Sequence, residues 1–125
     1  MEKPISRQQH GFTDYSYIPL VAAAPMLADF KDQPTATLLT RVLSGGILAT
    51  SLMTRAEWGA FRVLPFKAHL AADAAVGTLT LAAPWLFSFA NHRRARNAFL
   101  AIGAFGLMAG LLSRPEEMNE QSLTS

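Results

Sequence analysis

The chain has 125 residues, enough for one domain, and half of them are apolar. Charged residues make up 16%, below the roughly 25% of average soluble domains, and the net charge of +2 comes from dispersed basic residues, which excludes a nucleic-acid footprint. The absence of cysteine excludes disulfides and thiol-based metal or redox chemistry.

A polar tail at residues 1–9 precedes four apolar segments, whose Ala- and Leu-rich composition favours helices over strands. The first covers only 14 residues between Asp14 and Asp29, and the second is interrupted by Arg41. The third, residues 74–91, has 18 residues without an ionisable group, and the fourth, residues 97–113, has 17. A bilayer core needs roughly 20 apolar residues per helix. Hydropathy alone therefore predicts two membrane spans, the third and the fourth.

The sequence matches itself, without gaps, at an offset of 59 residues. The matched pairs include His10 with His69, Asp14 with Asp73, Ala23-Ala24-Pro25 with Ala82-Ala83-Pro84, Phe30 with Phe89, Arg55 with Arg114 and Glu57 with Glu116. Thr54 aligns with Ser113, a conservative pair. Because repeated units adopt the same form, the first two segments are expected to span as the last two do.

The sequence thus predicts an all-α, four-helix transmembrane bundle made of two repeated helical hairpins. The expected layout is a polar tail at 1–9, a first hairpin at 10–57, a joint at 58–68, a second hairpin at 69–116 and a polar tail at 117–125. A soluble four-helix bundle is the alternative, because the mean hydropathy of +0.19 is modest and the first segment is short.

Prolines and small residues occupy the apolar segments. Pro25 and Pro84 each remove a backbone donor and are expected to kink their helices. Small residues allow helices to approach closely, and packing within the chain is expected at Gly45, Gly46, Gly106 and Gly110.

Two hairpins place both termini and the joint on one side of a membrane. That side carries six basic residues: Lys3, Arg7, Arg55, Arg62, Lys67 and Arg114. By the positive-inside rule, this charge predicts cytoplasmic termini in a bacterial inner (plasma) membrane. On the opposite side, contacts with lipid headgroups are expected for Arg93, Arg94 and Arg96.

Polar residues are expected to gather at one membrane face. His10 and Asp14 share a helix face because they are four residues apart, and His69 and Asp73 repeat the pattern. The hairpin topology brings the Thr/Ser-Arg-x-Glu ends to the same depth, so the expected interfacial network is His10, Asp14, Arg55, Glu57, His69, Asp73, Arg114 and Glu116. In the favoured interpretation these carboxylates pair with Arg or His and dock the hairpins; a metal site and a proton or ion path are the alternatives.

Several stretches resemble the SPW-repeat family of bacterial integral membrane proteins, named for a Ser-Pro-Trp motif in each repeat. They are Thr54-Arg55-Ala56-Glu57-Trp58-Gly59, Arg62-Val63-Leu64-Pro65, His69-Leu70 with Asp73, and Ala83-Pro84-Trp85-Leu86-Phe87 with Phe89. The motif appears here as Ala83-Pro84-Trp85 and Ala24-Pro25-Met26, so neither copy keeps the Ser and the first lacks the Trp. The resemblance implies a membrane protein with two helices per repeat and no established activity.

No phosphate loop or nucleophile elbow occurs in the sequence, so no enzyme activity, cofactor or bound metal is expected. The predicted function is a structural or assembly component of a membrane. Its expected partners are the lipid bilayer and either further copies of the chain or a larger membrane complex. The alternative is an ion- or proton-handling, or metal-binding, membrane protein that uses the paired His-x-x-x-Asp motifs.

Overall fold

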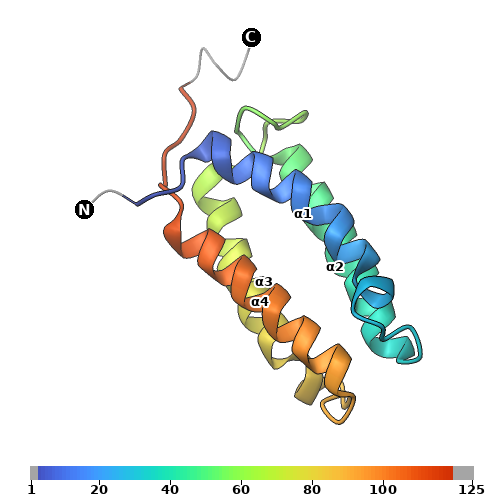
Figure 1. The fold of residues 1–125 in the computed structure, drawn as a ribbon. Helices are drawn as coiled ribbons and strands as arrows, with labels where there is room; N and C mark the ends of the chain where they lie inside the picture. Colours follow the sequence, from blue (N-terminus) through green and yellow to red (C-terminus); the bar gives the residue numbers. More distant parts are fainter. Residues whose placement is uncertain (1–2, 120–125) are drawn as a thin grey trace.

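A computed structural model describes residues 3–119 and shows four helices in that part of the chain, which confirms the expected all-α bundle (Figure 1). The helices are α1 (Arg7–Leu27), α2 (Pro34–Met53), α3 (Phe66–Leu86) and α4 (Arg93–Leu112). Helices α1 and α2 form one hairpin, and α3 and α4 form the other. Both described termini and the joint between the hairpins lie at one end of the bundle, here called the terminal end. The two hairpin loops lie at the opposite end, the loop end.

Each helix begins where the sequence supplies acceptors for its free backbone N–H groups. Ser6 caps α1 in a reciprocal capping box with Gln9. The Gln33 side chain accepts the first N–H groups of α2, and Pro34 follows at the first helical position. Helix α3 has no such neighbour; the carboxylate of Glu117 instead accepts its first two N–H groups, at 2.7 and 2.9 Å. The segment after α4 is thereby fastened to the start of α3.

The two aligned prolines lie near helix ends. Helix α1 ends two residues after Pro25, and α3 ends two residues after Pro84. Just beyond, Asp29 and Ser88 have φ of 56° and 60°, and the N–H of Phe30 donates to the Pro25 carbonyl at 2.9 Å. This is the six-to-one hydrogen bond of a Schellman ending. The predicted mid-span kinks are therefore wrong, because the prolines sit where the helices terminate.

A phenylalanine cluster joins the hairpins at the loop end. Phe30, Phe89 and Phe99 are at most 2% exposed. The Phe99 ring lies 6.3 Å from that of Phe30 and 4.9 Å from that of Phe89. Alanines from all four helices surround the rings, so this is where the bundle is most fully packed.

Two short parallel bridges join the hairpins at the terminal end. Ile5 pairs with Ser113, and Thr54 pairs with Leu64. The backbone N–H of Arg55 donates to Leu64 at 2.7 Å, and that of Arg114 donates to Ile5 at 2.8 Å. Each bond maps onto the other when 59 is added to or subtracted from the residue numbers. The two hairpins therefore exchange equivalent contacts, as two subunits of a symmetric dimer do.

The second hairpin is packed closely through glycines. A Cβ on Gly77 would lie 2.7 Å from the backbone nitrogen of Leu107, and one on Gly103 would lie 2.8 Å from that of Leu81. Gly110 also faces α3, since a Cβ added there would lie 3.1 Å from the carbonyl oxygen of Leu70. Gly106 reaches only the Cα of Gly77, at 4.0 Å.

Helix α2 is different. A Cβ on Gly45 or Gly46 would meet no atom within 4 Å. The close packing within the chain that was expected at these two glycines is therefore absent.

Two helices are long and apolar enough to cross a membrane, α2 and α4. The expectation that hydropathy would single out the third segment with the fourth is wrong. Helix α3 begins at Phe66 and so includes Lys67 and Asp73, and it ends at Leu86 before residues 87–91. Helix α2 keeps only Arg41 as an ionisable residue, and its mean hydropathy reaches 1.3.

Candidate functional site: a buried His/Asp cluster at the terminal end

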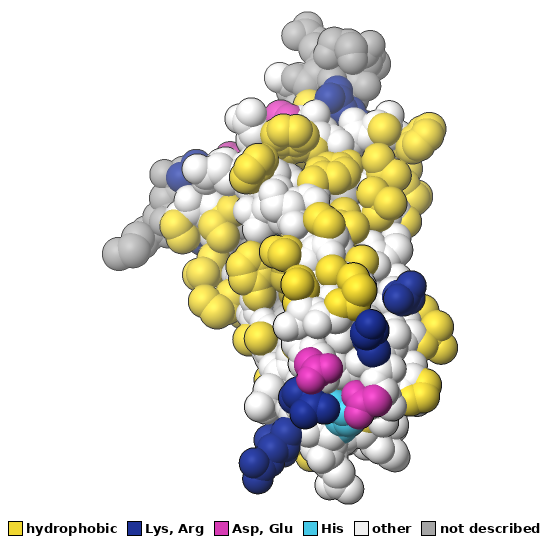
Figure 2. All heavy atoms as spheres, turned by 45° about the vertical axis from the view of Figure 1, so that its right-hand side comes forward, with side chains coloured by type: hydrophobic (Ala, Val, Ile, Leu, Met, Phe, Trp, Pro, Cys, Tyr) yellow, Lys and Arg dark blue, Asp and Glu magenta, His cyan; other side chains and the backbone are white. Residues whose placement is uncertain are grey.

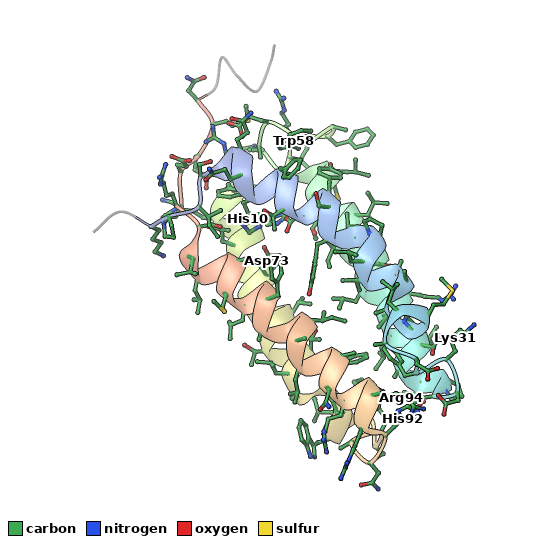
Figure 3. All side chains as sticks on the ribbon, viewed as in Figure 1. His10, Lys31, Trp58, Asp73, His92 and Arg94 are labelled. Atoms are coloured by element: carbon green, nitrogen blue, oxygen red, sulfur yellow. The ribbon has the colours of Figure 1, made fainter. Side chains whose placement is uncertain are left out.

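Four side chains converge between the hairpins at the terminal end. They are called here the His/Asp cluster and comprise His10, Asp14, His69 and Asp73. The Nε2 atom of His10 lies 2.8 Å from Asp73 Oδ2 and 3.2 Å from Asp14 Oδ2. The Nε2 atom of His69 lies 2.8 Å from Asp14 Oδ2 and 3.3 Å from Asp73 Oδ2. The structure thus brings together the two predicted His-x-x-x-Asp motifs, and Figure 3 shows His10 and Asp73 facing each other across the hairpins.

The cluster is removed from solvent. His10, His69 and Asp14 are 1%, 2% and 7% exposed, and Asp73 is the most accessible member. The Phe66 ring covers it, edge-on to His10 at 5.5 Å and stacked on His69 at 6.0 Å. Buried charges need partners, and every ionisable group of the cluster has one here.

Hydroxyl groups fix the orientation of both imidazoles. His10 Nδ1 lies 2.6 Å from Ser113 Oγ, and His69 Nδ1 lies 2.7 Å from Thr54 Oγ1. Each hydroxyl already donates its hydrogen to a helix carbonyl, that of Ala109 or of Thr50. A hydroxyl whose hydrogen is engaged can only accept, so Nδ1 must be the donor in both histidines. Each Nε2 is therefore the nitrogen presented to the carboxylates.

The contacts within the cluster cross between the two repeats. His10 of the first repeat bonds Asp73 and Ser113 of the second. His69 of the second repeat bonds Asp14 and Thr54 of the first. An offset of 59 residues relates every one of these pairs. The cluster is thus nearly two-fold symmetric, except that Ser51 adds a 3.5 Å contact to Asp14 that Gly110 cannot supply to Asp73.

The predicted arginine partners lie elsewhere. Arg55 Nε donates to the carbonyl of Arg62, and Arg114 Nε donates to that of Lys3. The ion pairs described for Asp14 and Asp73 are with histidines, so the expected pairing with His or Arg is met by His. Helices α2 and α4 end just before Thr54 and Ser113, and the next residue on each side turns outward.

The predicted glutamates bind a different arginine. Arg7 Nη2 lies 2.7 Å from Glu57 Oε1, and the Arg7 backbone N–H donates to Glu116 Oε1 at 3.0 Å. The hydrogen bonds from Arg7 lower the pKa of Glu57, against a smaller opposing effect of burial. Both glutamates thus join α1 to neighbouring segments at the terminal end, outside the His/Asp cluster.

Cavities open from the cluster towards the middle of the bundle. One small cavity of about 30 Å³ is lined by Asp14, Asp73 and Tyr17 among others. Tyr17 crosses it, donating its hydroxyl to the Ile102 carbonyl at 2.6 Å and stacking on Phe105. A larger one of about 270 Å³ lies between α2 and α3, with Asp73 and Gly46 in its lining.

A second group of charges occupies the loop end. His92 caps α4 through Nδ1, which accepts from Ala95 N–H, so its Nε2 carries the hydrogen that faces Asp32 at 3.0 Å. This hydrogen bond lowers the pKa of the exposed Asp32 carboxyl. Arg94 donates to the Asp29 carbonyl, and His92 and Arg94 lie together at this end (Figure 3). Arg93 is exposed, and Arg96 bonds the side chain of Asn97.

Some residues of the site were missed by sequence reasoning. Thr54 and Ser113 supply the acceptors that orient the histidines, and the only sequence signal was their alignment at the 59-residue offset. Phe66 was expected at a membrane interface, yet it is 1% exposed and covers the cluster. Nothing in the sequence pattern indicated that Tyr17 would cross between the hairpins.

Comparison with known proteins gives one result that bears on identity. No curated protein and no solved structure matches the chain. A family model described as the SPW repeat domain matches residues 9–113, which include all four helices apart from the first two residues of α1. The suspected resemblance is confirmed, and the chain belongs to the SPW repeat family.

Proposed function

We propose that this chain is an integral membrane protein in which both hairpins span the bilayer, and that its role is structural. The observation that carries the proposal is the exposure of its most apolar helices. Only 22% of the apolar window of α2 and 28% of that of α4 is buried inside the bundle. The core helix of a water-soluble protein buries most of such a window, because apolar surface is driven out of water.

Large apolar side chains project from all four helices. Those at least 38% exposed include Leu20, Met26, Leu38, Val42, Leu79, Trp85, Phe105, Met108 and Leu111. Figure 2 shows such side chains spread over the middle and upper parts of one face, with a group of charged side chains at the lower, loop end. An apolar middle between charged ends matches the profile of a bilayer.

The polar groups inside this apolar region support the same proposal. Asp14 and Asp73, the acidic residues within the helices α1 and α3, are both paired with histidines between the hairpins. Ionisable groups in membrane segments face the bundle interior and bind one another in this way. The cluster therefore serves to dock the hairpins without any catalytic step.

Membrane insertion is tested by fractionation of cells that express the chain. The protein is expected to stay in the membrane pellet after alkaline carbonate washing and to be released by detergent. Recovery in the aqueous fraction without detergent would instead mean a soluble bundle.

A matched pair of variants makes this test sharper. Leu79→Arg places a charge on an exposed position in the body of α3, where insertion is expected to lose about 2.5–3.5 kcal/mol. Met26→Arg places the same charge on an equally exposed position in the last turn of α1, where the side chain can reach the headgroups. The first variant should leave the membrane fraction and the second should remain. Equal behaviour of the two would count against a bilayer around α3.

We further propose that two copies of the chain associate through α2. Gly46 has no neighbour within 4 Å of an added Cβ, and it lines the cavity of about 270 Å³ between α2 and α3. Small residues on an exposed helix face let a second helix approach closely in a membrane. The cavity offers room for side chains of that helix.

Filling this space is expected to separate the copies. Gly46→Leu should convert a dimer in mild detergent or nanodiscs to a monomer, as measured by mass photometry, while leaving the helical circular dichroism unchanged. Leu111→Ala, on exposed helix α4, is the control and should remain dimeric. A monomeric wild-type chain would contradict this proposal and leave the membrane proposal intact.

A further inference from the structure

The His/Asp cluster has the geometry of a metal site. Four ligand atoms, one from each residue, all lie within 4.8 Å of one another. A tetrahedral ion with bonds near 2.0 Å needs ligand atoms about 3.3 Å apart. Two of the four Nε2–Oδ2 distances, 3.2 and 3.3 Å, already match, and the other two are 2.8 Å. An opening of about half an ångström along two edges completes the tetrahedron.

The histidines are held in the form that a metal requires. A metal-bound imidazole uses one nitrogen as the ligand and donates a hydrogen bond from the other. Ser113 Oγ and Thr54 Oγ1 can only accept, so they keep the hydrogen on Nδ1 and leave Nε2 as the ligand atom. The same two hydroxyls supply the second coordination shell that fixes each ring.

Charge and chemistry select the ion. Two neutral imidazoles and two carboxylates carry a charge of −2, which balances a divalent cation in this buried place. Nitrogen and oxygen ligands without sulfur suit zinc and the neighbouring divalent transition metals, and they are too few for calcium, which takes six to eight oxygens.

The position between the repeats gives such an ion a structural role. Each repeat contributes one His and one Asp, four residues apart on one helix face. The hairpins meet through few other contacts in the middle of the bundle, where cavities separate them. An ion at the cluster would connect the two hairpins through four bonds.

We propose that His10, Asp14, His69 and Asp73 bind one divalent transition-metal ion of the zinc class, which fastens the two repeats together. This proposal goes beyond membrane insertion and does not depend on it.

The test measures metal in the full chain, purified without a polyhistidine tag. Elemental analysis by inductively coupled plasma mass spectrometry is expected to find about one zinc, or an equivalent divalent transition metal, per chain. After chelation, titration with Co²⁺ should produce the visible absorption bands of a four-coordinate cobalt centre, and Zn²⁺ should displace them.

Variants assign the ion to the cluster. Asp73→Asn preserves the shape of the most accessible ligand and should remove most of the bound metal, while the helical circular dichroism confirms that the chain is folded. Ser113→Ala removes only the acceptor for His10 Nδ1 and should weaken Co²⁺ affinity by about 10- to 100-fold. His92→Gln is the matched control, since His92 is the remaining histidine and caps α4 at the loop end. It should bind metal as the wild type does.

Two outcomes would overturn the proposal. One is a folded wild-type chain that neither contains metal nor binds Co²⁺ or Zn²⁺, which would leave the cluster as two imidazolium–carboxylate pairs. The other is metal that Asp73→Asn retains and His92→Gln loses, which would move the site to the loop end. Because metal content is measured on the chain itself, either outcome can be read whether the protein comes from the membrane or from the aqueous fraction.

Discussion

Replacing Asp14 by alanine is expected to lower the free energy of unfolding by about 3 to 5 kcal/mol, because it removes one member of a buried charged group and leaves the other members unpaired. Asp14 Oδ2 lies 2.8 Å from His69 Nε2 and 3.2 Å from His10 Nε2, and the residue is 7% exposed. Neither histidine can turn to water, since each is 2% exposed or less and held at Nδ1 by a hydroxyl. The measurement is thermal or denaturant unfolding in detergent, followed by circular dichroism.

The chain offers a matched control for this substitution. Asp32 also faces the Nε2 of a histidine, His92, at 3.0 Å, but its side chain is 64% exposed. Water can replace the lost partner there, and exposed ion pairs contribute little to stability. Asp32→Ala is therefore expected to leave the unfolding transition nearly unchanged. Similar effects of the two substitutions would mean that burial of the His/Asp cluster does not stabilise the bundle.

The Asp32 pair also has a defined pH dependence. Its hydrogen bond from His92 lowers the pKa of the Asp32 carboxyl in the folded chain. A carboxyl with a lowered folded-state pKa adds stability at pH values above its unfolded pKa, and this stability is lost as the pH falls through the folded pKa. Comparison of Asp14→Ala and Asp32→Ala is therefore best made near neutral pH, where the Asp32 pair is intact.

Gly77→Ala is expected to destabilise the second hairpin by about 1 to 3 kcal/mol through overpacking. The added Cβ would lie 2.7 Å from the backbone nitrogen of Leu107 and 3.0 Å from the carbonyl oxygen of Gly103, so α3 and α4 must move apart. Backbone atoms cannot turn away as a flexible side chain does. Unfolding in detergent measures the loss, and Gly103→Ala should act in the same direction because its Cβ would meet the Leu81 nitrogen at 2.8 Å.

Gly45→Ala is the control, since an added Cβ there meets nothing within 4 Å. In a helix interior, alanine is favoured over glycine by roughly 0.5–1 kcal/mol, so this variant should be equally or slightly more stable than the wild type. If Gly77→Ala and Gly45→Ala shifted stability in the same direction, close packing of α3 on α4 through glycine would be disproved.

Internal repetition of the sequence predicted much of the candidate site. Spacing of four residues places His10 and Asp14 on one helix face, the 59-residue offset supplies His69 and Asp73, and hairpin topology brings both pairs to one end. These rules depend only on the helical period and on the direction of the chain. They therefore predicted which residues meet, and the cluster has this composition.

The same rules failed at the residues that complete the cluster. Arg55 and Arg114 were expected beside the carboxylates, yet the inward-facing residues are the preceding ones, Thr54 and Ser113. Helices α2 and α4 end at Met53 and Leu112, and beyond a helix end the period of 3.6 no longer relates a residue number to a direction. Only the bridges to Leu64 and Ile5 decide where each side chain points.

The glycines show the same division. Sequence alone determined that α2 and α4 each carry small residues on one face. Tertiary structure decided that Gly103 and Gly110 approach α3 within van der Waals contact while Gly45 and Gly46 face open space. The reason is that the rotation of a helix about its own axis is set by all of its packing partners together, and no local pattern contains that information. The sequence by itself thus determined four helices, two repeats and the paired His-x-x-x-Asp motifs, and the packing of the hairpins decided how those motifs close into one buried site.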